Sequence, residues 1–185
     1  MDADEQSPSN TPVTALAQDT GNMDPTFADE IAAEPGGEHL RRCFACGTCT
    51  ASCPVREVTE RYNPRRIIHM AVLGLREAVL SSDFIWLCST CYACHERCPQ
   101  DVRITELMHA IKNVAVRHGY IHPSFRSQVD LLQHHGRLYD ITSFENGRRI
   151  EQGLPAITER AEDFPPIFVV TGLDRLVQPE RGEAA

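Results

Sequence analysis

The sequence predicts a mainly all-α protein, in which one central domain carries the chemistry and irregular extensions flank it on both sides. Apolar residues recur at the spacing of a helix in two segments, residues 64–75 and 104–119. All eight cysteines lie in two short runs, and the segment between the runs reads as helices rather than hairpins. The composition divides the chain into three parts, residues 1–36, 37–122 and 123–185.

The first part, residues 1–36, is expected to be an acidic arm that is disordered or becomes ordered on a partner, because it holds few large apolar side chains. Residues 1–40 contain nine acidic residues and neither Lys nor Arg, so the net charge of −8 resides at this end of the chain. The rest is close to neutral. The sequence therefore argues against a nucleic-acid partner, since phosphate binding needs a surplus of clustered Lys and Arg.

The central domain is predicted to begin with a short helix over residues 39–43, just before the first cysteine run. A longer helix is expected to begin at Asn63-Pro64, because Asn is a favoured N-cap residue and Pro suits the first helical position. Gly74 marks the end of this helix. A further short helix is expected over residues 77–80.

Two more helices are predicted around the second cysteine run. Residues 84–88 lead into the run as a short helix. Residues 104–118 form the clearest helix in the chain, since apolar side chains recur there with the i, i+3, i+4, i+7 pattern. Asp101 or Thr105 is expected to cap this helix, and Gly119 to end it.

The third part, residues 123–185, has weaker signals. Apolar residues between Phe125 and Leu132 predict one helix, and residues 167–170 predict a short extended segment. Asn146-Gly147 and Pro165-Pro166 are expected to interrupt regular structure in the remainder. The sequence therefore predicts an extension with little core of its own.

The chemistry resides in the cysteine runs, CFACGTCTASCP from Cys43 and CSTCYACHERCP from Cys88. Both follow the pattern Cys-x2-Cys-x2-Cys-x3-Cys-Pro, which is the spacing of bacterial ferredoxins, and they begin 45 residues apart. Three cysteines of a run can hold three corners of a [4Fe–4S] cubane. The fourth points away, because the proline that follows it fixes the backbone, and so it can bind the other cluster.

This pattern predicts two [4Fe–4S] clusters with crossed ligands. We expect Cys43, Cys46, Cys49 and Cys98 to bind the first cluster, and Cys88, Cys91, Cys94 and Cys53 to bind the second.

Other interpretations of the cysteines remain open at this point. Eight cysteines could bind two zinc ions, which would give a metal-stapled scaffold without redox function, although zinc sites usually use two separated cysteine pairs. His95 lies inside the second run but at a spacer position, so it is interpreted as a neighbour of a cluster rather than a ligand. No catalytic motif is present in the sequence, and no catalytic residue is predicted.

The connection between the runs favours the all-helical ferredoxin arrangement over the small α+β ferredoxin. Within this class, residues 38–122 resemble the C subunit of the soluble CoB–CoM heterodisulfide reductase of methanogens. The resemblance rests on CFACGTCTASCPV, the helix start NPRRIIHMAVLG, and WLCSTCYACHERCPQDVRITELM.

The resemblance implies an electron-transfer subunit in a larger enzyme. In that family a flavin-containing A subunit bifurcates electrons, and the C subunit passes them through its two clusters to a catalytic B subunit. The B subunit reduces the CoM-S-S-CoB heterodisulfide in methanogenesis at a site built from Cys-Cys motifs. This chain has no Cys-Cys pair, so it is expected to be a non-catalytic relay. The electron donor could be a hydrogenase or a formate dehydrogenase, and residues 123–185 are expected to dock on partner subunits.

An iron–sulfur relay subunit of another oxidoreductase, resembling those of succinate, glycolate or glycerol-3-phosphate dehydrogenase, is the alternative. Those subunits usually carry a further domain that needs additional cysteines. We expect a cytoplasmic protein without a membrane span, because the sequence shows no secretory signal and its longest mainly apolar run, residues 67–75, is too short to cross a bilayer.

Overall fold

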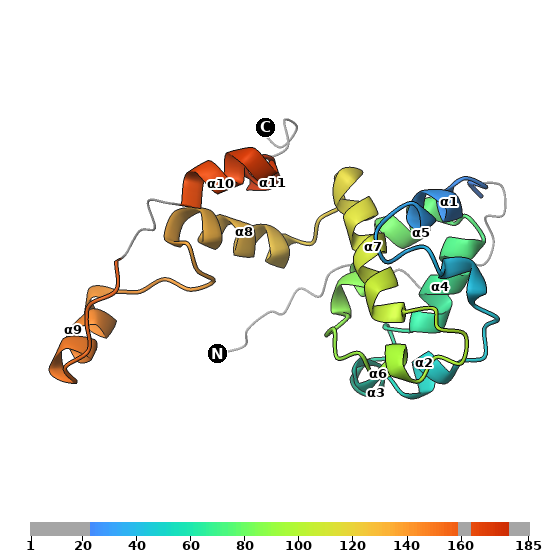
Figure 1. Cartoon of the computed structure of the whole chain (residues 1–185), viewed down its shortest axis with the longest axis horizontal. Helices are drawn as coiled ribbons and strands as arrows, with labels where there is room; N and C mark the ends of the chain where they lie inside the picture. Colours follow the sequence, from blue (N-terminus) through green and yellow to red (C-terminus); the bar gives the residue numbers. More distant parts are fainter. Residues whose placement is uncertain (1–22, 159–163, 178–185) are drawn as a thin grey trace, which may run out of the picture. The chain divides into compact units, whose positions relative to one another are not determined.

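The computed structural model describes residues 23–158 and 164–177, in which every regular element is a helix and none is a strand. The all-α prediction is therefore confirmed. The elements are α1 (Phe27–Ala32), η3 (Leu40–Arg42), α2 (Thr48–Ala51), α3 (Pro54–Val58), α4 (Pro64–Val72), α5 (Arg76–Leu80), η4 (Asp83–Leu87), α6 (Ala93–Glu96), α7 (Ile104–Arg117), α8 (Pro123–His135), α9 (Ser143–Glu151), α10 (Phe164–Thr171) and α11 (Asp174–Val177), with η marking 3-10 helices (Figure 1).

The chain divides into two compact units, and the boundary falls between Tyr120 and Ile121. The first unit contains both cysteine runs. In this unit α7 packs against α1, α5, η4 and α6, while α4 packs against α1, α2, α5 and η3. Figure 1 shows α2, α3 and α6 gathered at one end of the first unit, and α1 and α5 at the other. The cysteine runs therefore lie at one pole of a helical core.

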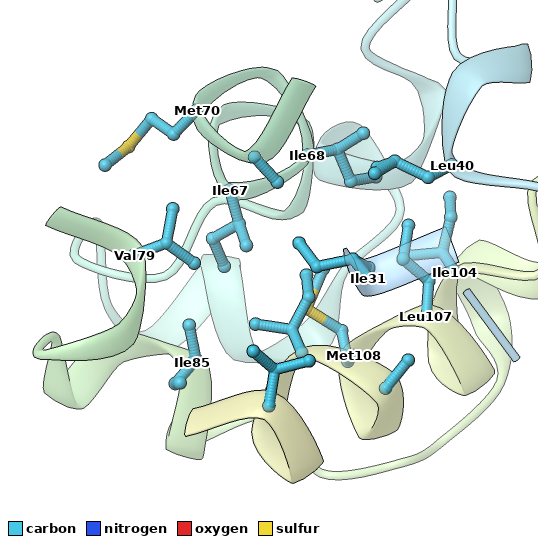
Figure 2. Close-up of a cluster of buried hydrophobic side chains, with 14 of the residues drawn as sticks. Ile31, Leu40, Ile67, Ile68, Met70, Val79, Ile85, Ile104, Leu107 and Met108 are labelled. Carbon is cyan, nitrogen blue, oxygen red and sulfur yellow. The ribbon is translucent and has the colours of Figure 1, made fainter. Parts of the chain in front are cut away.

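The core of the first unit is aliphatic, and α7 supplies its main stripe. Figure 2 shows Leu107 and Met108 of α7 facing Ile31 of α1 and Ile67 of α4. Each of these side chains is at most 1% exposed to solvent. Burying one such side chain contributes about 1.5–3 kcal/mol. The apolar stripe predicted on this helix therefore contributes much of the stability of the unit.

The predicted start of α4 is confirmed in detail. The Asn63 side chain accepts a hydrogen bond from the backbone N–H of Arg66 at 3.0 Å, and Pro64 occupies the first helical position. The helix ends at Val72, and Gly74 follows with a φ of 78°. Local sequence signals therefore position α4 correctly.

The predicted cap of α7 is wrong. The helix begins after Arg103, whose backbone has a φ of 55°, and no side chain caps it. Asp101 instead forms ion pairs with Arg42 and Arg103. Thr105 is 1% exposed, and its hydroxyl lies 3.9 Å from Cys94 Sγ. Both polar residues therefore make other contacts and do not cap the helix.

Residues 23–36, which the sequence assigns to the acidic arm, pack onto the first unit instead. Phe27 and Ile31 of α1 are fully buried. The Arg76 guanidinium pairs with Asp24 at 2.7 Å and with Glu30 at 2.5 Å. The acidic composition suggested an arm, but in the structure Asp24 and Glu30 form ion pairs with Arg76, which lies far away in the sequence. The first 22 residues of the predicted arm lie outside the described residues.

The second unit confirms one prediction and corrects two. Helix α8 covers the segment predicted around Phe125. Residues 167–170 belong to helix α10 rather than to an extended segment. Helix α9 continues through Asn146-Gly147, where an interruption was predicted. A capping box between Thr142 and Glu145 stabilises its first turn. The Asn146 amide also bonds both backbone groups of Ile157 at 2.9 Å.

Candidate metal centre

The two cysteine runs adopt the same backbone. Ala45 and Thr90 occupy equivalent positions and have φ values of 61° and 54°. Gly47 and Tyr92 are also equivalent, with φ values of 87° and 62°, and each immediately precedes a short helix, α2 or α6. Non-glycine residues rarely adopt this left-handed conformation, and they concentrate at functional sites. The left-handed residues bend each run into a tight loop around its cysteines.

The first cysteine site is a cavity that both runs line. Cys43, Cys46 and Cys49 of the first run share it with Cys98 of the second. Thr48, Val102 and Ile104 also line this cavity, whose wall is mainly apolar. Packing of α2 against α6 brings the two runs together. The structure therefore unites the four cysteines of the first predicted ligand set.

Hydrogen-bond donors surround the first site. The Thr48 hydroxyl lies 3.3 Å from Cys46 Sγ and lowers the pKa of that exposed thiol. The backbone N–H of Val102 donates to Cys98 Sγ at 3.4 Å. Burial raises the pKa of the Cys49 thiol. Donors directed at sulfur stabilise a thiolate, which is the form that binds iron.

The second site groups Cys53 of the first run with Cys88 and Cys94 of the second. All three lie near the buried side chain of Tyr62, and they help to raise its pKa. Burial raises the pKa of the Cys94 thiol to about 11, and the neighbouring thiols of Cys88, Cys49 and Cys53 raise it as well. These contacts bring together three members of the second predicted ligand set. The fourth, Cys91, is exposed, and only its place in the run associates it with them.

The donor set fits iron–sulfur clusters. All eight cysteines are free thiols, so none is consumed by a disulfide. Cys43, Cys46, Cys49 and Cys98 line one cavity, and four cysteine thiolates are the donor set that a [4Fe–4S] cluster uses.

Comparison with known proteins identifies the family. The 4Fe-4S dicluster domain family matches residues 39–102. The C subunit of the H(2):CoB-CoM heterodisulfide,ferredoxin reductase of Methanothermobacter thermautotrophicus is 35% identical over 164 residues, which are 85% of this chain and 88% of the relative. The chain belongs to the family of heterodisulfide reductase C subunits.

Other relatives agree with this assignment. The C subunit of the ferredoxin:CoB-CoM heterodisulfide reductase of Methanosarcina mazei is 40% identical, over 70% of this chain and 79% of the relative. The C2 subunit of the H(2)/formate:CoB-CoM heterodisulfide,ferredoxin reductase of Methanococcus maripaludis is 50% identical, over 43% of this chain and 42% of the relative.

Membership of this family decides between the interpretations that the cysteines left open. The chain is an iron–sulfur electron-transfer subunit of a multi-subunit oxidoreductase, heterodisulfide reductase, and it carries two [4Fe–4S] clusters. The zinc scaffold and the relay subunit of another dehydrogenase are thereby set aside. No helix among the described residues is long and apolar enough to cross a membrane.

Sequence reasoning missed the residues outside the runs that approach the cysteines of this heterodisulfide reductase subunit. Tyr62 precedes α4 and is buried in the same core cluster as Cys53 and Cys94, and Lys112 lies in α7. Lys112 also lies 5.9 Å from the centre of the Trp86 ring. His95, within the second run, has a ring nitrogen shielded from solvent and without a hydrogen-bond partner among the described residues. The sequence had already indicated His95 as a neighbour of a cluster, from its place between two predicted ligands.

Proposed function

We propose that the chain relays single electrons through its two clusters, from a flavin-containing, electron-bifurcating A-type subunit to a catalytic B-type subunit. The B-type subunit would reduce the CoM-S-S-CoB heterodisulfide in methanogenesis. When bound, a [4Fe–4S] cluster accepts and donates one electron at a time. The observation that carries the proposal is the convergence of both cysteine runs on shared sites at one pole of the first unit.

The proposal includes the crossed ligand sets. Cys43, Cys46, Cys49 and Cys98 would hold one cluster, and Cys88, Cys91, Cys94 and Cys53 the other. The cavity shared by Cys98 with the first run supports the first set. The position of Tyr62 among Cys53, Cys88 and Cys94 supports the second. Crossing places the clusters side by side, because each run contributes ligands to both, and this suits passage of an electron between them.

The division of labour follows from the cysteine count. All eight cysteines are used as cluster ligands, and the chain has no Cys-Cys pair for a heterodisulfide-reducing site. This chain would therefore be a non-catalytic relay, with chemistry at the disulfide left to the B-type subunit. The relatives' names mention hydrogen, formate and ferredoxin. A hydrogenase or a formate dehydrogenase in a larger complex is accordingly the proposed source of electrons. A cytoplasmic location stays a prediction from the sequence.

The second unit would dock on partner subunits. Phe144 and Ile150 of α9 are 71% and 62% exposed, and Val170 of α10 is 87% exposed. Helices α8 and α9 contain no buried residue. Apolar side chains left exposed on helices with so little core are typical of protein–protein contacts. We place the docking segment at residues 123–185, and the domain that binds the clusters at residues 37–122, onto which residues 23–36 pack.

An anaerobic reconstitution tests the relay. The complex is assembled from the A-type, B-type and present chains and supplied with the electron donor. The present chain should contain about eight irons and eight sulfides, the sum of two [4Fe–4S] clusters. Omitting it should abolish heterodisulfide reduction while flavin reduction in the A-type subunit persists. Full heterodisulfide reduction without this chain would contradict the proposal.

A further inference from the structure

Thr48 places a hydroxyl beside one of the cysteines of the first site. It is the first residue of α2, and its hydroxyl lies 3.3 Å from Cys46 Sγ. Cys46 is exposed, and both residues line the cavity that holds Cys43, Cys49 and Cys98. A thiolate that binds iron carries no proton, so the hydroxyl is the donor of this hydrogen bond once Cys46 is a ligand.

We infer that Thr48 is a positioning residue of the electron relay, whose hydroxyl donates a hydrogen bond to the Cys46 sulfur and thereby raises the reduction potential of the first cluster. The inference rests on the proposed relay function. One electron added to a cluster and its four thiolates increases their negative charge by one. A hydrogen bond to a ligand sulfur stabilises that added charge, and such bonds are among the determinants of cluster potential.

The second run lacks this hydroxyl. Ala93 occupies the position of Thr48, as the first residue of α6. It follows Tyr92, which adopts the same left-handed backbone as Gly47 in the first run. Ala93 has no hydroxyl to offer the equivalent ligand, Cys91, which is also exposed. The hydrogen bond is therefore a property of one run and not of the ferredoxin spacing that both runs share.

Another hydroxyl lies near a cysteine of the second site, but at a longer distance. Thr105 of α7 is buried, and its hydroxyl is 3.9 Å from Cys94 Sγ. At the first site the backbone N–H of Val102 also donates to Cys98 Sγ, at 3.4 Å, and no side-chain substitution removes that donor. Hydrogen bonds weaken with distance, so of the two hydroxyls Thr48 should have the larger effect on its own cluster.

The test measures the midpoint potential of each cluster by EPR at controlled potentials, in the full chain purified anaerobically with its partner subunits. Thr48→Val keeps the shape of threonine without the hydroxyl, whereas Thr48→Ser keeps the hydroxyl. We expect Thr48→Val to shift one of the two midpoints to a more negative value at unchanged iron and sulfide content. Thr48→Ser should keep both midpoints at their wild-type values.

Ser52→Ala is the matched control for loosening of the same short helix. The Ser52 hydroxyl donates to the Thr48 carbonyl at 2.8 Å and not to a cysteine. This variant should therefore shift neither midpoint.

The second run allows the reverse experiment. Ala93→Thr adds a hydroxyl where the shared backbone conformation would place it beside Cys91, and it should shift the other midpoint to a more positive value. This variant removes no contact of the first site, so it keeps the inference testable if Thr48→Val does not retain its clusters. An unchanged midpoint in Ala93→Thr would then reject the inference.

Three results with Thr48→Val would overturn the inference: both midpoints stay at their wild-type values, both move together, or Thr48→Ser causes an equal shift. A shift of the same midpoint by Thr48→Val and by Ala93→Thr would also overturn it, because the two positions adjoin ligands of different clusters. These outcomes are separate from failure of the proposed function, which would show as wild-type chain that carries no clusters or passes no electrons to the B-type subunit.

Discussion

Substitution of Gly74 by alanine tests whether residues 23–36 belong to the fold of the first unit. Gly74 follows α4 with a φ of 78°, and its carbonyl accepts a hydrogen bond from Asp24 N–H at 2.8 Å. A β-carbon at this position would lie 2.3 Å from the Asp24 carbonyl oxygen. Because the opposing atoms are backbone, the clash can be relieved only by moving the segment that carries α1.

The expected cost has three parts. Holding alanine in the left-handed conformation costs about 1–2 kcal/mol. Loss of the Asp24 hydrogen bond costs about 1 kcal/mol. Weakening of the partly exposed Arg76–Asp24 ion pair adds at most about 1 kcal/mol. The docking of α1 should therefore weaken by roughly 3 kcal/mol, which corresponds to about 100-fold faster opening exchange of its amides.

Hydrogen–deuterium exchange of residues 27–33 measures this effect directly. Gly153→Ala is the matched control, because Gly153 also has a positive φ, 73°, but nothing lies within 4 Å of the added carbon. Exchange in α1 should rise about 100-fold in Gly74→Ala and stay at the wild-type rate in Gly153→Ala. If α1 amides in Gly74→Ala exchange within about threefold of the wild-type rate, the packing of residues 23–36 against Gly74 is wrong.

Three further predictions concern the ligands, the core and the second unit. Cys53→Ser should damage the cluster bound by Cys88, Cys91 and Cys94 and leave the other more nearly intact, and EPR that shows loss of the opposite cluster alone would contradict crossed ligation. Phe27→Ala, at a fully buried side chain, should lower the free energy of unfolding of the first unit by about 3–5 kcal/mol, whereas a loss below about 1 kcal/mol in denaturant titration would place α1 outside the core. Hydrogen bonds from Thr142 lower the pKa of Glu145 below 4.5, so the protection of α9 amides should be constant above that pH and fall as the pH drops through the folded pKa. Glu145→Gln keeps the capping box without the charge and should abolish this pH dependence, so a wild-type profile in that variant would assign the effect to another group.

The sequence predicted those parts of the molecule whose causes are local. Asn63-Pro64 starts α4 because the cap and the proline act within one turn. The stripe on α7 persists over its 14 residues, long enough for the helical period to be clear. Residues 167–170 were predicted to be extended because branched apolar side chains favour strands. Strand propensity is a weak predictor where tertiary packing favours another conformation.

Features with distant causes escaped prediction. Helix α1 has only six residues, too few to show a period, and its Glu30 pairs with Arg76 and His118, which are more than 40 residues away. Its composition resembles that of a disordered arm, since composition alone does not show which charged residues will form ion pairs in the folded protein. Tyr62 lies in a polar segment with no repeating pattern, and only the fold brings it between the two runs.

The two cysteine runs share one backbone conformation, which bears on how the potentials of the two clusters can differ. Tyr92 adopts the left-handed conformation that Gly47 adopts in the first run, although a side chain there costs about 1–3 kcal/mol. The loop geometry is thus kept at some cost in stability, which fits a shape imposed by the cluster. Because the two loops share one backbone conformation, their differences lie in the side chains. The Thr48 hydroxyl lies 3.3 Å from Cys46 Sγ in the first run, whereas Ala93 occupies the equivalent position of the second. The duplicated runs would then specify two similar electron carriers, while side chains that the two copies do not share would determine how readily each accepts its electron.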